Sequence, residues 1–102
     1  MDLISQVIVE TLEYIKDKPI SCESALNKLD KDLILIKDSF KLEEEDFNYT
    51  VEYYEKLKPI LLECVSILKG IRTKEIETII NSEQLLTYKA IIKSLIEEYK
   101  GE

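Results

Sequence analysis

Residues 22–40, CESALNKLDKDLILIKDSF, decide the fold class of this chain. Apolar side chains recur in this stretch at intervals of four, three, four, three and four residues: Cys22, Leu26, Leu29, Leu33, Ile36 and Phe40. This spacing places them on one face of an α-helix, and such a face is stable only when a partner helix covers it. We therefore predict a helix that Ser21 caps, with Leu29 and Leu33 in the central core.

Similar patterns on both sides of that stretch predict further helices. Before it, Asp2 is a good N-cap for a helix over residues 3–15, which ends at the breaker Asp17-Lys18-Pro19. After it, apolar residues at helical spacing cover residues 47–57, 61–68, 76–80 and 85–99. The apolar residues do not alternate as they would in a strand. The sequence thus predicts an all-α fold of four to five helices in a single domain over residues 1–102.

Two similar segments indicate an internal repeat. Residues 14–23, YIKDKPISCE, and residues 54–63, YEKLKPILLE, share the pattern YxKxKPIxxE. Proline removes a backbone donor and collides with the preceding turn, so we expect the third helix to kink or stop at Pro59. A duplication of residues 2–41 as 42–81 would give two similar helical hairpins, each turning at its KPI segment, plus a C-terminal helix. Chance alignment among the common residues of this chain is the alternative.

The charge of the chain favours protein partners. It carries 21 acidic and 14 basic residues, for a net charge of -7, which repels phosphate backbones and anionic membrane surfaces. No run reaches the roughly 18 apolar residues of a membrane span. Asp2, Glu10 and Glu13 are unlike a signal peptide. We therefore expect a cytoplasmic protein that does not bind membranes. Its first expected partner is a protein, and nucleic acid is the second hypothesis.

Two common components of catalytic and metal sites are missing from the sequence. It has no histidine, the usual general base and zinc ligand, and its two glycines cannot form a phosphate-binding loop. Cys22 and Cys64 lack metal-binding spacing and fit either buried thiols or a disulfide. A magnesium site at Glu10, Glu13 and residues 43–45 is an enzymatic alternative, although solvated acidic faces explain the same residues. We expect no enzyme activity and no cofactor.

The candidate binding residues lie near the start of the third helix: Tyr49, Tyr53, Tyr54, Glu43, Glu44, Glu45 and Asp46. Tyrosine is enriched in interface cores because it buries a large area and keeps a polar tip. Tyr53 and Tyr54 cannot both enter one narrow core stripe, so we expect at least one to be partly exposed. Two packed hairpins leave a groove, and we predict a non-enzymatic interaction module that binds a protein or peptide there. A second copy of the chain could fill the same groove and give a homodimer.

Residues 73–96, TKEIETIINSEQLLTYKAIIKSLI, give an alternative function. They resemble a helix-turn-helix, with a short helix, a turn at Asn81-Ser82 and a longer helix that exposes Thr87, Lys89 and Lys93. In that motif the second helix enters the major groove of DNA. The turn has no glycine and the segment has few basic residues, so two packed core helices explain the pattern as well. A DNA-binding regulator is therefore the second hypothesis.

The chain as a whole resembles the small orphan helical proteins of viruses that infect hyperthermophilic archaea. The resemblance is one of character and rests on helices rich in Ile, Lys and Glu, on the KPI segments and on the lack of a catalytic motif. Chains rich in Lys and Glu are also typical of hyperthermophiles. The resemblance implies a small helical protein of the host cytoplasm, and it carries no functional residue over to this chain.

Overall fold

The computed structural model describes residues 2–72 and 83–101. They form four α-helices and one 3₁₀ turn: α1 (Leu3–Ile15), η1 (Pro19–Ser21), α2 (Cys22–Ser39), α3 (Glu44–Arg72) and α5 (Glu83–Lys100). No strand occurs within these two ranges, which confirms the all-α fold class. The short helix predicted over residues 76–80 lies outside the described residues.

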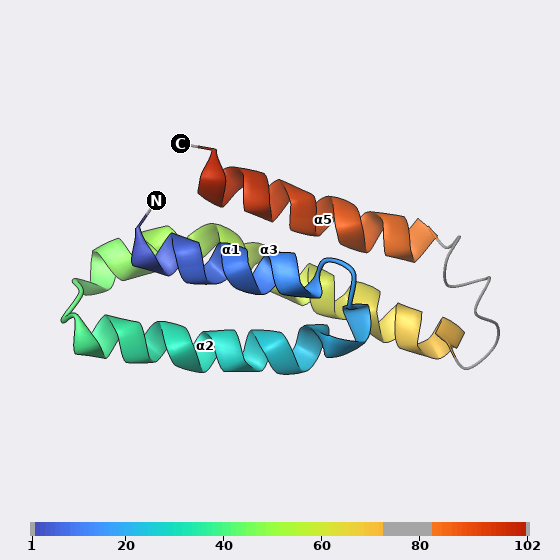
Figure 1. Cartoon of the computed structure of the whole chain (residues 1–102), viewed down its shortest axis with the longest axis horizontal. Coiled ribbons are helices and arrows are strands. Elements are labelled where there is room, and N and C mark those ends of the chain that lie inside the picture. Colours follow the sequence, from blue (N-terminus) through green and yellow to red (C-terminus); the bar gives the residue numbers. More distant parts are fainter. Residues whose placement is uncertain (1, 73–82, 102) are drawn as a thin grey trace.

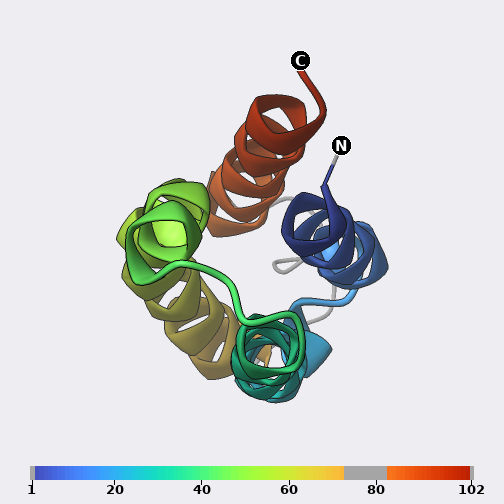
Figure 2. The same ribbon diagram turned by 90° about the vertical axis from the view of Figure 1, so that its left-hand side faces the viewer.

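The helices form an antiparallel bundle (Figure 1). Consecutive helices run in opposite directions, so α1 and α3 begin, and α2 and α5 end, at the same end of the molecule. Figure 2 looks at this end and shows α1 between α2 and α5, with α3 on the opposite side. The helix contacts agree, because α5 packs on α1 and α3 while α2 packs on the same two helices from below. Each helix therefore buries one face.

The core of the bundle confirms the apolar spacing of the sequence. Its buried apolar residues are Ile4, Ile8, Val9, Leu12, Ile15, Cys22, Leu26, Leu29, Leu33, Val51, Tyr54, Leu61, Cys64, Val65, Leu68, Tyr88, Ile92 and Leu95. Leu29 and Leu33 are both buried, as predicted. Phe40 departs from the pattern, because α2 ends at Ser39 and the Phe40 side chain is 63% exposed.

Helix α1 begins and ends where the sequence predicts. The Asp2 carboxylate accepts a hydrogen bond from the Ser5 backbone N–H at 2.7 Å, which satisfies one of the donors that every helix start leaves unpaired. Pro19 occupies the first position of η1, where a missing N–H and a fixed φ are an advantage. The first KPI segment is therefore the turn of the hairpin formed by α1 and α2.

The second KPI segment corrects the prediction for Pro59. The expected hairpin turn there is wrong, because α3 is continuous from Glu44 to Arg72 with Pro59 inside it. Tyr54 and Leu61 are buried on either side of the proline, and this packing outweighs the loss of one helical hydrogen bond. The Pro59 ring itself is exposed.

The paired-hairpin arrangement is consequently not confirmed. Pro19 begins a 3₁₀ turn and its counterpart Pro59 lies inside a helix. Tyr14 is exposed, whereas its counterpart Tyr54 is fully buried. The two copies of the sequence pattern therefore have different surroundings, and the duplication stays a prediction.

Two tyrosine hydroxyls of α5 tie this helix to its neighbours. The Tyr88 hydroxyl donates to the Ile15 carbonyl at the end of α1, over 2.6 Å. The Tyr99 hydroxyl donates to the Thr50 carbonyl over 2.7 Å and accepts from the Tyr54 backbone N–H over 3.1 Å. Thr50 and Tyr54 are four residues apart in α3, so Tyr99 joins the two groups that an undisturbed helix would pair directly. Burial raises the pKa of Tyr99 to about 12.

Candidate functional site

A hollow of about 300 Å³ opens at the end of the bundle where α1 begins, α2 ends and α3 begins. This is the end that faces the reader in Figure 2. We call it the end pocket, and it is lined by Asp2, Leu3, Ile4, Ile36, Phe40, Leu42, Glu43, Asp46, Phe47 and Thr50. Six of these ten residues are apolar and three are acidic, which makes the end pocket an apolar depression with a negatively charged rim.

The turn between α2 and α3 builds one wall of the end pocket. Lys41 adopts a left-handed conformation, with φ of 50°. Its N–H bonds the Asp38 carbonyl over 3.3 Å, and the Leu42 N–H bonds the Lys37 carbonyl over 3.0 Å. This pair of bonds is the Schellman motif that ends many helices, and the motif usually brings the residue after the left-handed position back onto the helix. Leu42 and Ile36 accordingly line the same pocket.

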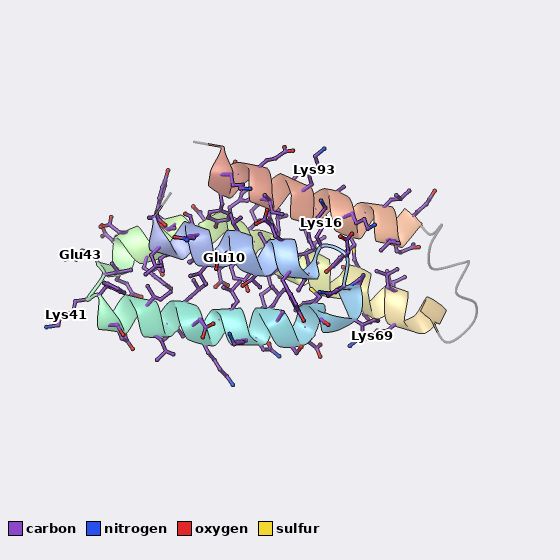
Figure 3. All side chains as sticks on the ribbon, in the orientation of Figure 1. Glu10, Lys16, Lys41, Glu43, Lys69 and Lys93 are labelled. Carbon is purple, nitrogen blue, oxygen red and sulfur yellow. The ribbon has the colours of Figure 1, made fainter. Side chains whose placement is uncertain are left out.

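The charges around the end pocket are unevenly distributed. Glu44 pairs with Lys37 across the α2–α3 turn, and the hydrogen bond and positive charge of Lys37 lower the pKa of Glu44. The Lys37 Nζ also lies 5.2 Å from the centre of the Phe47 ring, a cation–π contact. Glu43 and Asp46, by contrast, line the pocket and are exposed. Figure 3 shows Glu43 and Lys41 together at this end of the molecule.

The acidic part of the predicted site is divided by the structure. Glu44, Glu45 and Asp46 form the first turn of α3, where the positive end of the helix dipole favours carboxylates. Glu43 and Asp46 line the end pocket. Glu44 pairs with Lys37, and Glu45 is exposed and does not line the pocket.

The three predicted tyrosines occupy three different environments. Tyr49 is 81% exposed and lies beside the end pocket, because the hollow that it lines shares Asp2 and Thr50 with that pocket. Tyr53 is half-buried and lines the same second hollow. Tyr54 is fully buried. Tyr53 is therefore the partly exposed member of the Tyr53-Tyr54 pair, as expected for at least one of them. Tyr54 is the member that enters the core.

Tyr54 has a structural role, which corrects its place among the binding residues. Its hydroxyl donates to Asp30 Oδ1 of α2 over 2.7 Å, and Lys58 pairs with the other oxygen of the same carboxylate. Burial, followed by the hydrogen bond to Asp30, raises the pKa of the Tyr54 hydroxyl. Tyr54 thus connects α3 to α2 and offers no surface to a partner.

The residues that sequence reasoning missed are the apolar lining of the end pocket. Leu3 and Phe40 are exposed, while Leu42 and Phe47 are partly buried against the core. The sequence could have indicated Phe40, because Phe40 is the last residue of the apolar stripe of α2 and the helix ends one residue before it. Leu3 gave no such signal, because its proximity to the α2–α3 turn arises only when α1 packs on both helices.

The described residues give little support to a metal site, a disulfide or a membrane-spanning helix. Within residues 2–72 and 83–101, no three potential ligands lie close enough together to hold a metal ion. Cys22 and Cys64 are both buried free thiols, and burial raises the pKa of each. No helix within the described ranges has the length and apolar character needed to cross a bilayer.

The helix-turn-helix hypothesis rests on residues 73–96, of which the structure describes the part within α5. Thr87 and Lys93 of that helix are exposed, and Figure 3 shows Lys93 projecting from it. Lys89 instead pairs with Asp17 in the turn after α1, with its Nζ 3.5 Å from Asp17 Oδ1. The DNA-binding function stays a prediction.

Comparisons with protein-family models, curated proteins and solved structures found no match to this chain. The viral resemblance therefore stays a prediction, and functional inference depends on the geometry and charge described above.

Proposed function

We propose that this protein is a non-enzymatic interaction module, and that its partner is a protein or peptide segment with an apolar anchor flanked by basic residues. The observation that supports this proposal is the composition of the end pocket. Its apolar lining comes from α1, α2, α3 and the turn between α2 and α3, and three acidic residues, Asp2, Glu43 and Asp46, complete it. The proposal therefore places the binding site in the end pocket, in place of the predicted groove between two hairpins.

The apolar lining supplies the affinity. A hollow of about 300 Å³ accommodates one or two large side chains. Burying apolar surface is worth about 25 cal/mol per Å², so an anchor placed between Phe40 and Leu3 removes unfavourable exposed area from both partners. Tyr49 extends this surface, since its exposed ring lies just beyond the Thr50 that both hollows share.

The acidic rim selects the partner. The net charge of -7 raises the local concentration of cationic segments and opposes nucleic acid. Rim carboxylates mainly change the association rate and its salt dependence, because water and ions screen them. Binding should therefore weaken with added salt, and the contribution of the apolar lining should remain.

Two synthetic peptides test the proposal directly. They share the same Leu and Phe positions, and one carries Lys where the other carries Glu. We expect the basic peptide to bind, to shift the amide signals of residues around the end pocket, and to lose affinity as salt is added. Equal binding of both peptides, or amide shifts confined to a different part of the bundle, would contradict the proposal.

A matched pair of variants locates the binding surface. Phe40 is 63% exposed in the pocket lining and Leu35 is 62% exposed on α2 outside it, so Ala at either position removes a similar exposed side chain. Phe40→Ala should weaken peptide binding by about tenfold, which is about 1.4 kcal/mol, and Leu35→Ala should leave it unchanged. Equal effects of the two variants would assign the site elsewhere.

A further inference from the structure

One side of α3 carries an apolar stripe outside the end pocket. Tyr53, Ile60 and Ile67 follow one another at intervals of seven residues, which is close to two helical turns, so they share one face. Ile60 is 45% exposed and Ile67 is 43% exposed. Tyr53 is half-buried, packs against the core with part of its ring and lines the hollow of Tyr49. None of the three lines the end pocket. Apolar residues at this spacing fit a second helix packed along them.

We propose that a second copy of this chain covers the stripe, with the two α3 helices antiparallel about a twofold axis near Ile60. Tyr53 and Ile67 are each seven residues from Ile60, or about 10.5 Å at 1.5 Å per residue. The twofold axis therefore places Tyr53 of one copy beside Ile67 of the other, and the two Ile60 side chains beside each other. Such a self-complementary patch is what a symmetric dimer needs.

The charges along the stripe support antiparallel pairing with a second copy. Lys56 lies four residues before Ile60 and Glu63 lies three residues after it, and both side chains are exposed. In the antiparallel pair, Lys56 of one copy faces Glu63 of the other with an offset of one residue, about 1.5 Å along the helix. The symmetry makes two such pairs. A parallel arrangement would instead place Lys56 against Lys56 and Glu63 against Glu63, and like charges across a helix interface select against it.

The continuity of α3 is what creates this surface. A hairpin turn at Pro59 would have placed Tyr53 and Ile67 on two different helices. In the continuous helix they lie on one line, with Ile60 between them. The dimer is independent of the end pocket, which contains neither the stripe nor its two charged residues.

Sedimentation over a dilution series tests the dimer. We expect a monomer–dimer equilibrium in the unmodified protein, and at least a tenfold weaker dimer in Ile60→Glu. Leu86→Glu is the control, because Leu86 is 64% exposed on α5 outside the stripe, and it should leave the dimer unchanged. Circular dichroism should show that both variants keep their helices. A monomer at every attainable concentration, or a dimer that Ile60→Glu does not weaken, would overturn the proposal.

Charge reversal tests the antiparallel pairing. Lys56→Glu and Glu63→Lys should each weaken the dimer, because each places like charges opposite one another. The double variant restores opposite charges, and it should return the dissociation constant to that of the unmodified protein. If both single variants weaken the dimer and the double variant does not restore it, the two helices do not pair in this register. The double variant keeps the net charge of -7, so its peptide binding at the end pocket should equal that of the unmodified protein, which separates this test from that of the proposed function.

Discussion

Replacing Pro59 with Ala tests whether α3 is one continuous helix. Ala restores a backbone N–H, which can donate to the Glu55 carbonyl, and it removes the collision of the proline ring with the preceding turn. Proline in a helix interior is about 3 kcal/mol less favourable than alanine in peptides. Two effects reduce this gain. The unfolded chain becomes more flexible, at a cost of about 0.4–1 kcal/mol, and the packing around Pro59 has already adapted to it.

The expected net result is a gain of about 1–2 kcal/mol in the free energy of unfolding. For a domain of this size, that gain should raise the melting temperature by roughly 5–15 °C. Urea and thermal unfolding followed by circular dichroism measure both quantities. The variants must be compared at one protein concentration, because a dimer makes the melting temperature depend on concentration.

Pro19→Ala is the matched control. Pro19 starts η1, where its fixed φ is already suitable and no donor is needed. Its replacement should lower stability by about 0.4–1 kcal/mol. The opposite signs at Pro59 and Pro19 are the decisive result. If both replacements destabilise the protein to the same extent, Pro59 lies at a turn, and the continuous α3 helix is wrong.

Three further predictions concern the core. Leu29→Ala and Leu33→Ala should each lower the free energy of unfolding by about 2–5 kcal/mol in urea titrations, and an unchanged midpoint in both would place them outside the core. Tyr54→Phe removes a hydrogen bond to the charged Asp30, and because Asp30 is partly solvated the loss should lower the free energy of unfolding by about 1–2 kcal/mol. If the losses from Tyr54→Phe and Asp30→Asn simply add in the double variant, the two side chains do not interact. Tyr99 has a pKa of about 12 in the folded protein and about 10 when unfolded, so its stabilising contribution is complete below pH 10 and is lost as the pH rises to 12. Tyrosinate absorbance should rise together with unfolding, and ionisation of all tyrosines in a fully folded protein would refute the burial.

The helices were predictable where local pattern and tertiary packing agree. Asp2 and the breaker before Pro19 set the limits of α1, and the stripe containing Leu29 identified the buried face of α2. Pro59 was mispredicted because the rule for proline describes an isolated helix, in which nothing compensates for the lost hydrogen bond. In the bundle, buried side chains before and after Pro59 hold both halves of α3 on the same neighbours.

The end pocket could be predicted only in part. The acidic run identified two rim residues, Glu43 and Asp46, since its charge is visible in the sequence. The Schellman turn was missed because Lys41 occupies the left-handed position where glycine is usual. Leu3 was missed because its position beside Phe40 depends on how far α1 and α2 extend at the same end of the bundle. That relation is a property of the packed helices.

The tyrosines show why the two proposed surfaces differ in their chemistry. Tyr54, Tyr88 and Tyr99 use their hydroxyls for hydrogen bonds inside the bundle, so these groups stabilise the fold. The two proposed surfaces use the rings of Tyr49 and Tyr53, aliphatic side chains, phenylalanine and the placement of charge. The end pocket is concave and its rim is acidic, so a second, equally acidic copy of the same pocket would be repelled from it. The α3 stripe carries one positive and one negative residue at nearly equal distances from Ile60, and an antiparallel second copy pairs both with opposite charges. We therefore propose two separate surfaces on the same acidic chain, one for a basic partner at the end of the bundle and one for a second copy along α3.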